Sequence, residues 1–99
     1  MEFDYQNIDP VFQSRIRLAI LSVLLTVERA EFSFLKEKVK ATDGNLGAHL
    51  KKLEDVEYIN TKKTFVDRKP VSFYNITEIG RNAIEDYLNT LGNLFGKPE

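Results

Sequence analysis

The chain has 99 residues, which is enough for one domain and too short for two. Hydrophobic residues make up 42% of the chain and charged residues 29%, a composition typical of globular proteins that argues against intrinsic disorder. The absence of cysteine excludes disulfide frameworks, thiolate zinc sites and cysteine nucleophiles.

The charge is unevenly distributed, although fourteen basic and fifteen acidic side chains give a net charge of only −1. Residues 33–70 hold nine basic and six acidic side chains, whereas both flanking segments are acidic. The net charge by itself predicts no nucleic-acid partner, but the middle third of the chain concentrates the positive charge.

The sequence contains no segment that resembles a membrane span or a secretory signal. The longest nearly apolar run covers residues 18–25, far short of the roughly 20 residues that cross a bilayer. The N-terminus carries Glu2 and Asp4, whereas a signal peptide begins with basic residues. We therefore expect a cytoplasmic protein that does not associate with membranes.

The first predicted element is a helix that is apolar on two sides. Asp9-Pro10 is a typical helix start, and Ser14 offers a second one, so residues 10–13 form either the same helix or a separate turn. One helical face then carries Ile16, Ile20, Leu24 and Val27, and another carries Leu18, Leu21 and Leu25. A helix that is apolar on both sides is buried on both sides. We expect one face in the domain core and the other against a second subunit.

Two further helices are predicted in the middle of the chain. Ser33 is the expected cap of a short helix that reaches about Lys40, with inward side chains at Phe34, Leu35 and Val39. Thr42 is the expected cap of the next helix, which runs to about Glu54 and has a core stripe at Leu46, Leu50 and Leu53. Asp43-Gly44 is also compatible with a hairpin turn, but the helical spacing of the leucines outweighs that dipeptide.

A hairpin and a long helix follow. Residues 58–65 and 71–76 are rich in β-branched and aromatic residues, and between them residues 66–70 form a polar loop that ends in a proline. These features predict a β-hairpin with a basic tip. Thr77-Glu78 then begins a long helix, over about residues 77–95, whose apolar side carries Ala83, Ile84, Tyr87, Leu88, Leu91 and Phe95.

The order of these elements predicts the fold. Two helices joined by a short turn, with a basic hairpin after the second one, form a winged helix-turn-helix. The predicted class is mainly α with a small β-hairpin: a three-helix core, a wing and a long C-terminal helix. We expect residues 1–99 to form a single domain of this kind.

The sequence also resembles a known group of proteins over about residues 8–90. Residues 42–54 read TDGNLGAHLKKLE, followed by EYI at 57–59, FVDRKP at 65–70 and YNITEIGR at 74–81. This series is similar to the recognition helix, strand start and wing of small prokaryotic winged-helix regulators close to the ArsR-like and MarR-like families. The resemblance implies a DNA-binding transcriptional regulator. The chain departs from the pattern at Gly47, where serine is frequent, and at Glu57 and Asp67, where glycine is frequent.

The predicted recognition helix carries the first set of candidate DNA contacts. If the leucines point inward, a step of 100° per residue turns Gly44, Ala48, Lys51 and Lys52 away from the core. Asn45 and Gly47 lie on the two shoulders, Thr42 precedes the first turn, and His49 lies at the boundary. The amide of Asn45 can pair bidentately with adenine, and the two lysines can reach phosphates. The alternative interpretation is an ordinary solvated helix face.

The hairpin carries the second set, which consists of Lys62, Lys63, Arg68 and Lys69. An arginine at the tip of a wing can enter the minor groove, where the electrostatic potential is most negative. Alternatively, Lys62 and Lys63 only protect an edge strand from pairing with another sheet.

No pattern in the sequence indicates catalysis or a bound metal. His49 is the only histidine, and the adjacent carboxylates in Glu54-Asp55 and Glu85-Asp86 diverge by about 100° on a helix. Arg15 and Arg17 are interpreted as interface or core-edge salt-bridge donors. We therefore expect no enzyme activity, no cofactor and no metal site.

The expected partners are double-stranded DNA and a second copy of the chain. The predicted homodimer interface joins the first and last helices through Leu18, Leu21, Leu25, Ile84, Tyr87, Leu88, Leu91 and Phe95. The acidic residues scattered among the basic ones leave an alternative open, a winged-helix module that binds protein and not DNA. The sequence assigns neither an operator nor a small-molecule effector.

Overall fold

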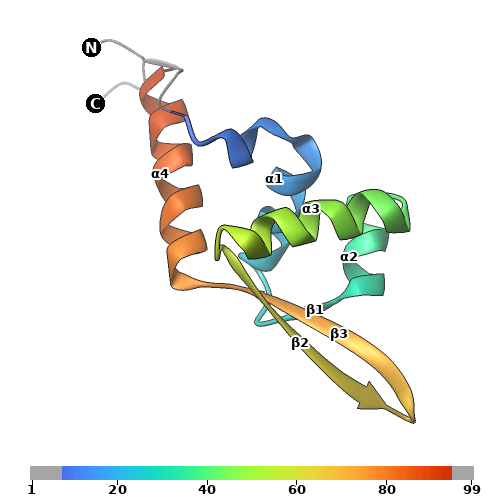
Figure 1. Cartoon of the computed structure of the whole chain (residues 1–99). Coiled ribbons are helices and arrows are strands. Elements are labelled where there is room, and N and C mark those ends of the chain that lie inside the picture. The colour runs from blue at the N-terminus through green and yellow to red at the C-terminus, as the bar shows by residue number, and fades with distance from the viewer. Residues whose placement is uncertain (1–7, 95–99) are drawn as a thin grey trace.

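The computed structural model describes residues 8–94 (Figure 1). The elements follow in the order η2 (Pro10–Gln13, a 3-10 helix), α1 (Arg15–Leu24), β1 (Ala30–Glu31), α2 (Phe32–Val39), α3 (Asp43–Asp55), β2 (Ile59–Val66), β3 (Lys69–Ile76) and α4 (Glu78–Leu94). Figure 1 shows the hairpin of β2 and β3 projecting beyond the helices. The predicted mainly helical winged-helix fold is confirmed.

The two candidate helix starts near the N-terminus are both used. The Asp9 carboxylate accepts a hydrogen bond from the Val11 N–H at 3.0 Å and begins η2. The Ser14 hydroxyl oxygen accepts one from the Arg17 N–H at 3.2 Å and begins α1. Residues 10–13 are therefore a separate short turn.

The helix-turn-helix follows the prediction at α3 and differs from it at α2. Thr42 caps α3 by accepting a hydrogen bond from the Asn45 N–H at 3.1 Å. Ser33 does not cap α2: the helix already begins at Phe32, and the Ser33 hydroxyl donates to the Glu31 carboxylate at 3.3 Å. Phe34 is exposed and not inward, because Leu35 occupies the core-facing position of this short helix.

The sheet is larger than the predicted hairpin. Its strand order is β1-β3-β2, antiparallel throughout, and the two-residue strand β1 pairs Ala30 with Tyr74. The predicted loop over residues 66–70 is too long, because Val66 pairs with Lys69 and leaves a two-residue turn. Pro70 lies within β3, opposite Phe65, along a part of β3 that β1 does not reach. Proline has no backbone N–H to donate to a neighbouring strand. Because β1 does not extend alongside Pro70, no hydrogen bond of the sheet is lost there.

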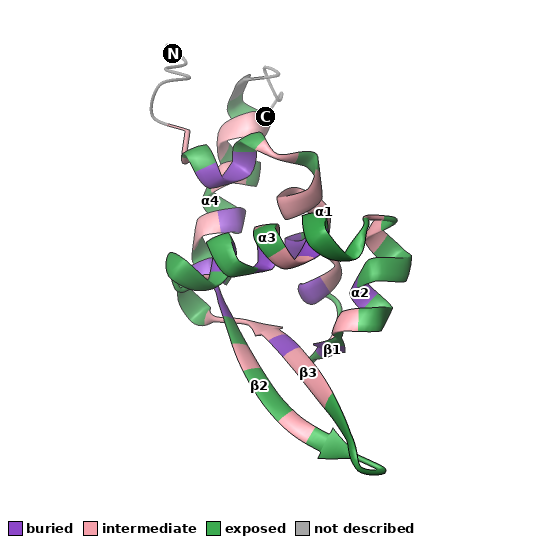
Figure 2. Cartoon of the chain, turned by 45° about the vertical axis from the view of Figure 1, so that its right-hand side comes forward, coloured by how far each residue is buried: buried purple, intermediate pink, exposed green. Residues whose placement is uncertain are grey.

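The core forms where η2, the helices α1 to α4 and the base of the sheet meet (Figure 2). Leu46, Leu50 and Leu53 are buried, which confirms the predicted core stripe of α3. Among the described residues, the buried apolar side chains are Val11, Phe12, Ile20, Leu21, Leu24, Ala30, Leu35, Leu46, Leu50, Leu53, Ile59, Tyr74 and Ile84. Within residues 8–94, no helix is long and apolar enough to cross a bilayer.

The start of α4 is locked against the residues that follow α3. The Thr77 N–H donates to the Tyr58 carbonyl at 2.9 Å, and the Thr77 hydroxyl donates to the Glu57 carbonyl at 2.7 Å. The same hydroxyl oxygen accepts from the Gly80 N–H at 2.9 Å and so caps α4. A Cβ atom at Gly80 would lie 2.2 Å from the Tyr58 carbonyl oxygen. Only glycine permits this approach of two backbones.

Replacing Gly80 with alanine is expected to lower the free energy of unfolding by about 1–3 kcal/mol, because the added methyl group must displace the Tyr58 backbone. Gly92→Ala is the matched control. A Cβ atom there meets nothing within 4 Å, and alanine in a helix interior is more stable than glycine by about 0.5–1 kcal/mol. Urea unfolding followed by circular dichroism measures both variants. Equal stability of Gly80→Ala and the parent would contradict the close approach.

Candidate nucleic-acid interface

The outer face of α3 is the centre of the candidate site. With its leucines buried, α3 exposes Gly44, Asn45, Ala48, Lys51 and Lys52, and leaves Gly47 and His49 half-buried. The four residues that the helical spacing turns outward are all exposed, and so is Asn45, which that spacing places on a shoulder. Gly44 and Gly47 leave open space around their backbones, because no atom lies within 4 Å of a Cβ built at either position. No neighbouring group of the described chain therefore covers α3 directly at these two positions.

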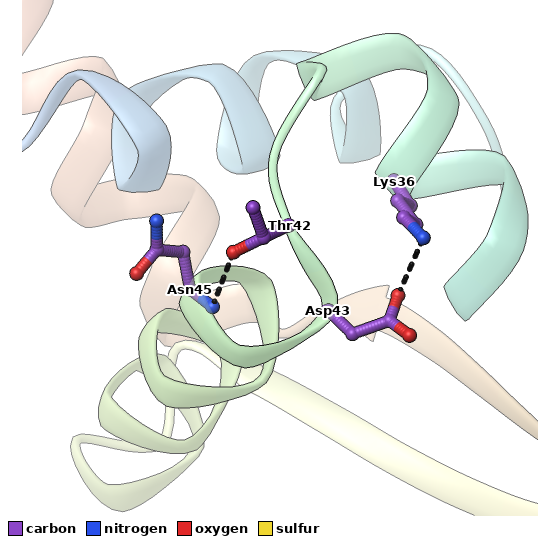
Figure 3. A network of polar contacts seen from close by, with 4 residues as sticks. All are labelled: Lys36, Thr42, Asp43 and Asn45. Atoms are coloured by element: carbon purple, nitrogen blue, oxygen red, sulfur yellow. Dashed lines mark hydrogen bonds and ion pairs between the residues drawn. The ribbon is translucent and has the colours of Figure 1, made fainter.

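Polar contacts fix the N-terminal turn of α3 (Figure 3). The Lys36 ammonium lies 2.8 Å from the Asp43 carboxylate and links α2 to α3. Figure 3 shows the side-chain amide of Asn45 on the other side of this turn from that ion pair. The Thr42 hydroxyl oxygen accepts the capping hydrogen bond, so its own proton remains available to an acceptor such as a phosphate oxygen.

His49 is held by an arginine from α1. The Nδ1 atom of His49 lies 3.1 Å from a terminal nitrogen of Arg17. A guanidinium has no acceptor, so Arg17 donates and the imidazole accepts as a neutral ring. The pKa of His49 is lowered, mainly because burial disfavours the charged ring and further because Arg17 and Lys52 are positive.

Arg17 is predicted to be a salt-bridge donor, but within residues 8–94 it forms no salt bridge. Its guanidinium also donates to the carbonyl of Val11 at 2.7 Å and to the carbonyl of Pro10 at 3.3 Å. Arg17 thereby joins η2, α1 and α3 through one side chain. The sequence offers no signal for this role, because the three acceptors are two backbone carbonyls and a residue 32 positions away.

Acidification is expected to weaken the hydrogen bond between Arg17 and His49. Because the pKa of His49 in the folded chain lies below the ordinary value of 6.5, the unfolded chain binds the proton more readily. The stabilising contribution is therefore present above pH 6.5 and is lost as the pH falls below it. The free energy of unfolding of the parent should fall more steeply towards about pH 5.5 than that of His49→Gln, whose amide oxygen accepts from Arg17 at either pH. Parallel profiles in urea unfolding would contradict the interaction.

Lys51 is engaged within α3. Its ammonium lies 2.7 Å from the Asp55 carboxylate, and this hydrogen bond is the main reason that the pKa of Lys51 is raised. Both side chains are largely exposed, and exposed pairs of this kind contribute little to stability. A phosphate can therefore replace Asp55 as the partner of Lys51 at small cost.

The two lysines of β2, Lys62 and Lys63, lie on different faces of the wing. Thr61 and Lys63 line a cleft of about 270 Å³ against α3, together with Gly47 and Lys51. Side chains alternate along a strand, so Lys62 lies on the opposite face, across from Phe73. The Thr61 hydroxyl oxygen is buried and has no hydrogen-bond partner within the described residues. The structure thus brings Lys63 to α3 and separates Lys62 from it.

The turn of the wing has unusual backbone conformations. Asp67 and Arg68 have φ angles of 52° and 68°, the left-handed region that two-residue hairpin turns require. Glycine is favoured at the second of these positions, which Arg68 occupies here. Glu57, at a position where similar regulators frequently have glycine, also has a positive φ of 65°.

The predicted dimer residues divide into two groups. Leu21 and Ile84 are fully buried within the single chain, so the core of the domain already uses them and their assignment to a dimer interface is wrong. Leu88 is 51% exposed, and the remaining predicted positions are half-buried at Leu18, Leu25, Tyr87 and Leu91. Tyr87 stacks on Phe12 with 4.7 Å between ring centroids. Phe95 lies outside the described residues.

The described part of the chain contains no group of three or more histidine, aspartate or glutamate side chains placed to hold a metal ion. The prominent features are instead a helix-turn-helix with an exposed second helix and a basic wing beside it. They define a winged helix-turn-helix protein.

Comparison with known proteins shows the family to which the chain belongs. Residues 16–95 match the model of the winged helix DNA-binding domain, and the chain belongs to that family. An uncharacterised protein of Methanocaldococcus jannaschii is 42% identical over 78 residues, which cover 79% of this chain and 85% of the relative.

Solved structures agree with the assignment. A transcriptional regulator homologue from Pyrococcus horikoshii superposes with a TM-score of 0.75 at 30% identity, covering 87% of this chain and 90% of its own. PadR of Bacillus subtilis, solved in complex with operator DNA, has a TM-score of 0.65 at 23% identity. The match covers 75% of this chain and 45% of PadR, and shows a shared fold. The resemblance to winged helix-turn-helix regulators is confirmed.

Proposed function

We propose that this chain is a transcriptional regulator that binds double-stranded DNA sequence-specifically as a homodimer. In this proposal α3 enters the major groove and the wing reaches the adjacent minor groove. The observation that carries the proposal is the exposed face of α3, where Gly44, Asn45 and Ala48 leave the backbone open beside Lys52. Small side chains allow a helix to approach the groove floor, and an exposed amide can read a base edge.

The length of the wing supports this arrangement. Thr61 lies against α3 and Val66 ends β2, so the strand runs about 17 Å from Thr61 to its end at about 3.3 Å per residue. One turn of DNA rises about 34 Å, and the minor groove lies about half a turn from the centre of the major groove. A wing of this length therefore reaches the neighbouring minor groove while α3 occupies the major groove.

The conformation of Arg68 provides a second argument. A residue other than glycine in the left-handed region destabilises the fold by about 1–2 kcal/mol, and such strained residues are concentrated at functional sites. Arg68 bears this cost at the furthest point of the hairpin, where its guanidinium is exposed. Entry into the minor groove gives the arginine a role that a glycine turn does not have.

Arg68→Gly is accordingly expected to stabilise the protein by about 1 kcal/mol and to weaken DNA binding. If a dimer neutralises about six to eight phosphates, the slope of log affinity against log salt is about −5 to −7, and the variant should make it shallower by about 2. Thermal unfolding and gel shifts over a salt series, with duplexes selected from a random pool, measure both effects.

Asn45→Ala is the matched control on α3. It removes no charge, so the salt slope should stay at the parent value while the preference for the selected duplex over random DNA falls. An Arg68→Gly variant whose DNA affinity and salt slope equal those of the parent would show that the tip of the wing does not contact DNA. A parent that shifts no duplex at low salt would favour the protein-binding alternative.

The dimer rests on the apolar surface of α4. This helix has 17 residues and is about 25 Å long at 1.5 Å per residue. Its buried side, with Ile84, packs on the core, whereas Leu88 remains half exposed. Two-fold pairing through Leu88, the half-buried Leu18 of α1 and the half-buried Leu25 just after α1 would place two copies of α3 about one DNA turn, near 34 Å, apart.

Leu88→Glu is expected to convert the dimer into a monomer of 11.4 kDa, because a carboxylate cannot be buried unpaired in an apolar interface. Ile79→Glu is the matched control, since Ile79 is 54% exposed on the first turn of the same helix, outside the proposed interface. It should keep the parent mass. Sedimentation at micromolar concentration measures all three proteins, and a monomeric parent would exclude the proposed dimer.

A further inference from the structure

The tip of the wing carries an exposed apolar pair in addition to its charges. Phe65 is 73% exposed and faces Pro70 across the two strands. Exposing a phenylalanine ring is unfavourable by up to about 3 kcal/mol relative to burying it. No described part of the chain covers the ring, because the hairpin projects beyond the helices (Figure 1).

The alternation of the strand places this pair on a definite face. Thr61 and Lys63 face α3, and Phe65 follows them at the same two-residue spacing. Phe65 and Pro70 therefore lie on the side of the sheet that α3 covers nearer its base. Val66 and Lys69 lie on the opposite side. The exposed ring is thus directed to the same side as the candidate interface.

The surrounding charge indicates the kind of partner. Arg68 and Lys69 at the tip, with Lys62 and Lys63 in the middle of β2, accompany one carboxylate, Asp67, in the hairpin. Among residues 8–94, none of these four basic side chains forms an ion pair. A second wing of the same charge would be repelled. The DNA minor groove instead has phosphates on both edges and apolar sugar and base surfaces between them.

We propose that Phe65, backed by Pro70, enters the minor groove as an apolar wedge and bends the DNA. The ring partly unstacks one base step, while Arg68 lies in the groove beside it and Lys69 holds a flanking phosphate. Wedges of this kind kink DNA by about 20–90°, most easily at flexible pyrimidine–purine steps. This inference rests on the proposed function and adds a source of sequence preference that needs no hydrogen bond to a base.

The test uses the full chain and the tightest-binding duplex recovered from a random pool, labelled at its two ends for energy transfer. Phe65→Thr is the informative variant, because threonine keeps the strand propensity and the charge while it removes the ring. Val66→Thr is the matched control: Val66 is 45% exposed, directly follows Phe65 and lies on the other face.

We expect the parent to shorten the end-to-end distance of the duplex, and Phe65→Thr to abolish the shortening and lower the affinity by about tenfold. The salt slope should not change, because no charge is lost. Val66→Thr should bend and bind like the parent. In the parent, replacing the pyrimidine–purine step under the wing with an A-tract should lower the affinity, whereas Phe65→Thr should bind both duplexes equally.

Binding without bending by the parent would overturn the wedge and leave the proposed function intact. Bending by Phe65→Thr equal to that of the parent would overturn the wedge as well. So would a loss of bending and affinity in Val66→Thr as large as that in Phe65→Thr. A parent that recovers no duplex from the pool would instead refute the proposed function together with this inference.

Discussion

The burial of one face of α3 is the constraint on which the rest of the site depends. Leu46, Leu50 and Leu53 fix the rotation of the helix about its own axis, because residues three and four apart share a face. Loss of one such leucine costs about 2–5 kcal/mol, a large share of the about 5–15 kcal/mol that stabilises a domain. The outward direction of Asn45 and Ala48 follows from this packing and needs no separate interaction.

Apolar packing fixes the rotation of α3 but tolerates small shifts along its axis, and polar contacts limit these shifts. The Lys36–Asp43 pair is exposed, so its contribution is small. The contacts of Arg17 are partly buried and charge-assisted, and they hold both η2 and His49 of α3. Arg17 is therefore the stronger restraint on where the outer face of α3 lies. Because His49 must stay neutral to accept from Arg17, this restraint is also the pH-sensitive one.

The sequence predicts the features that depend on neighbours in the chain and misses those that depend on distant ones. The caps at Ser14, Thr42 and Thr77 and the leucine stripe of α3 are local patterns, and all are found. The strand β1 has only two residues and exists because it pairs with β3. The contact of Arg17 with His49 and the close approach of Gly80 to Tyr58 join segments 20 or more residues apart, for which a single sequence holds no signal. The wing turn is shorter than predicted because Pro70 is tolerated where β3 has one neighbour.

The placement of charge reconciles a net charge of −1 with a DNA-binding family. Exposed charges act over about 10 Å at moderate salt, so the local balance matters more than the total. Asp43 and Asp55 on α3 are paired with Lys36 and Lys51, whereas the acidic residues of α4 lie far from the wing tip (Figure 1). At that tip Arg68 occupies a backbone conformation that favours glycine. A glycine would form the turn more easily but would remove the positive charge from the end of the wing. The backbone strain at Arg68 therefore accompanies a positive charge at the end of the wing. The composition of the chain does not reveal where that charge lies.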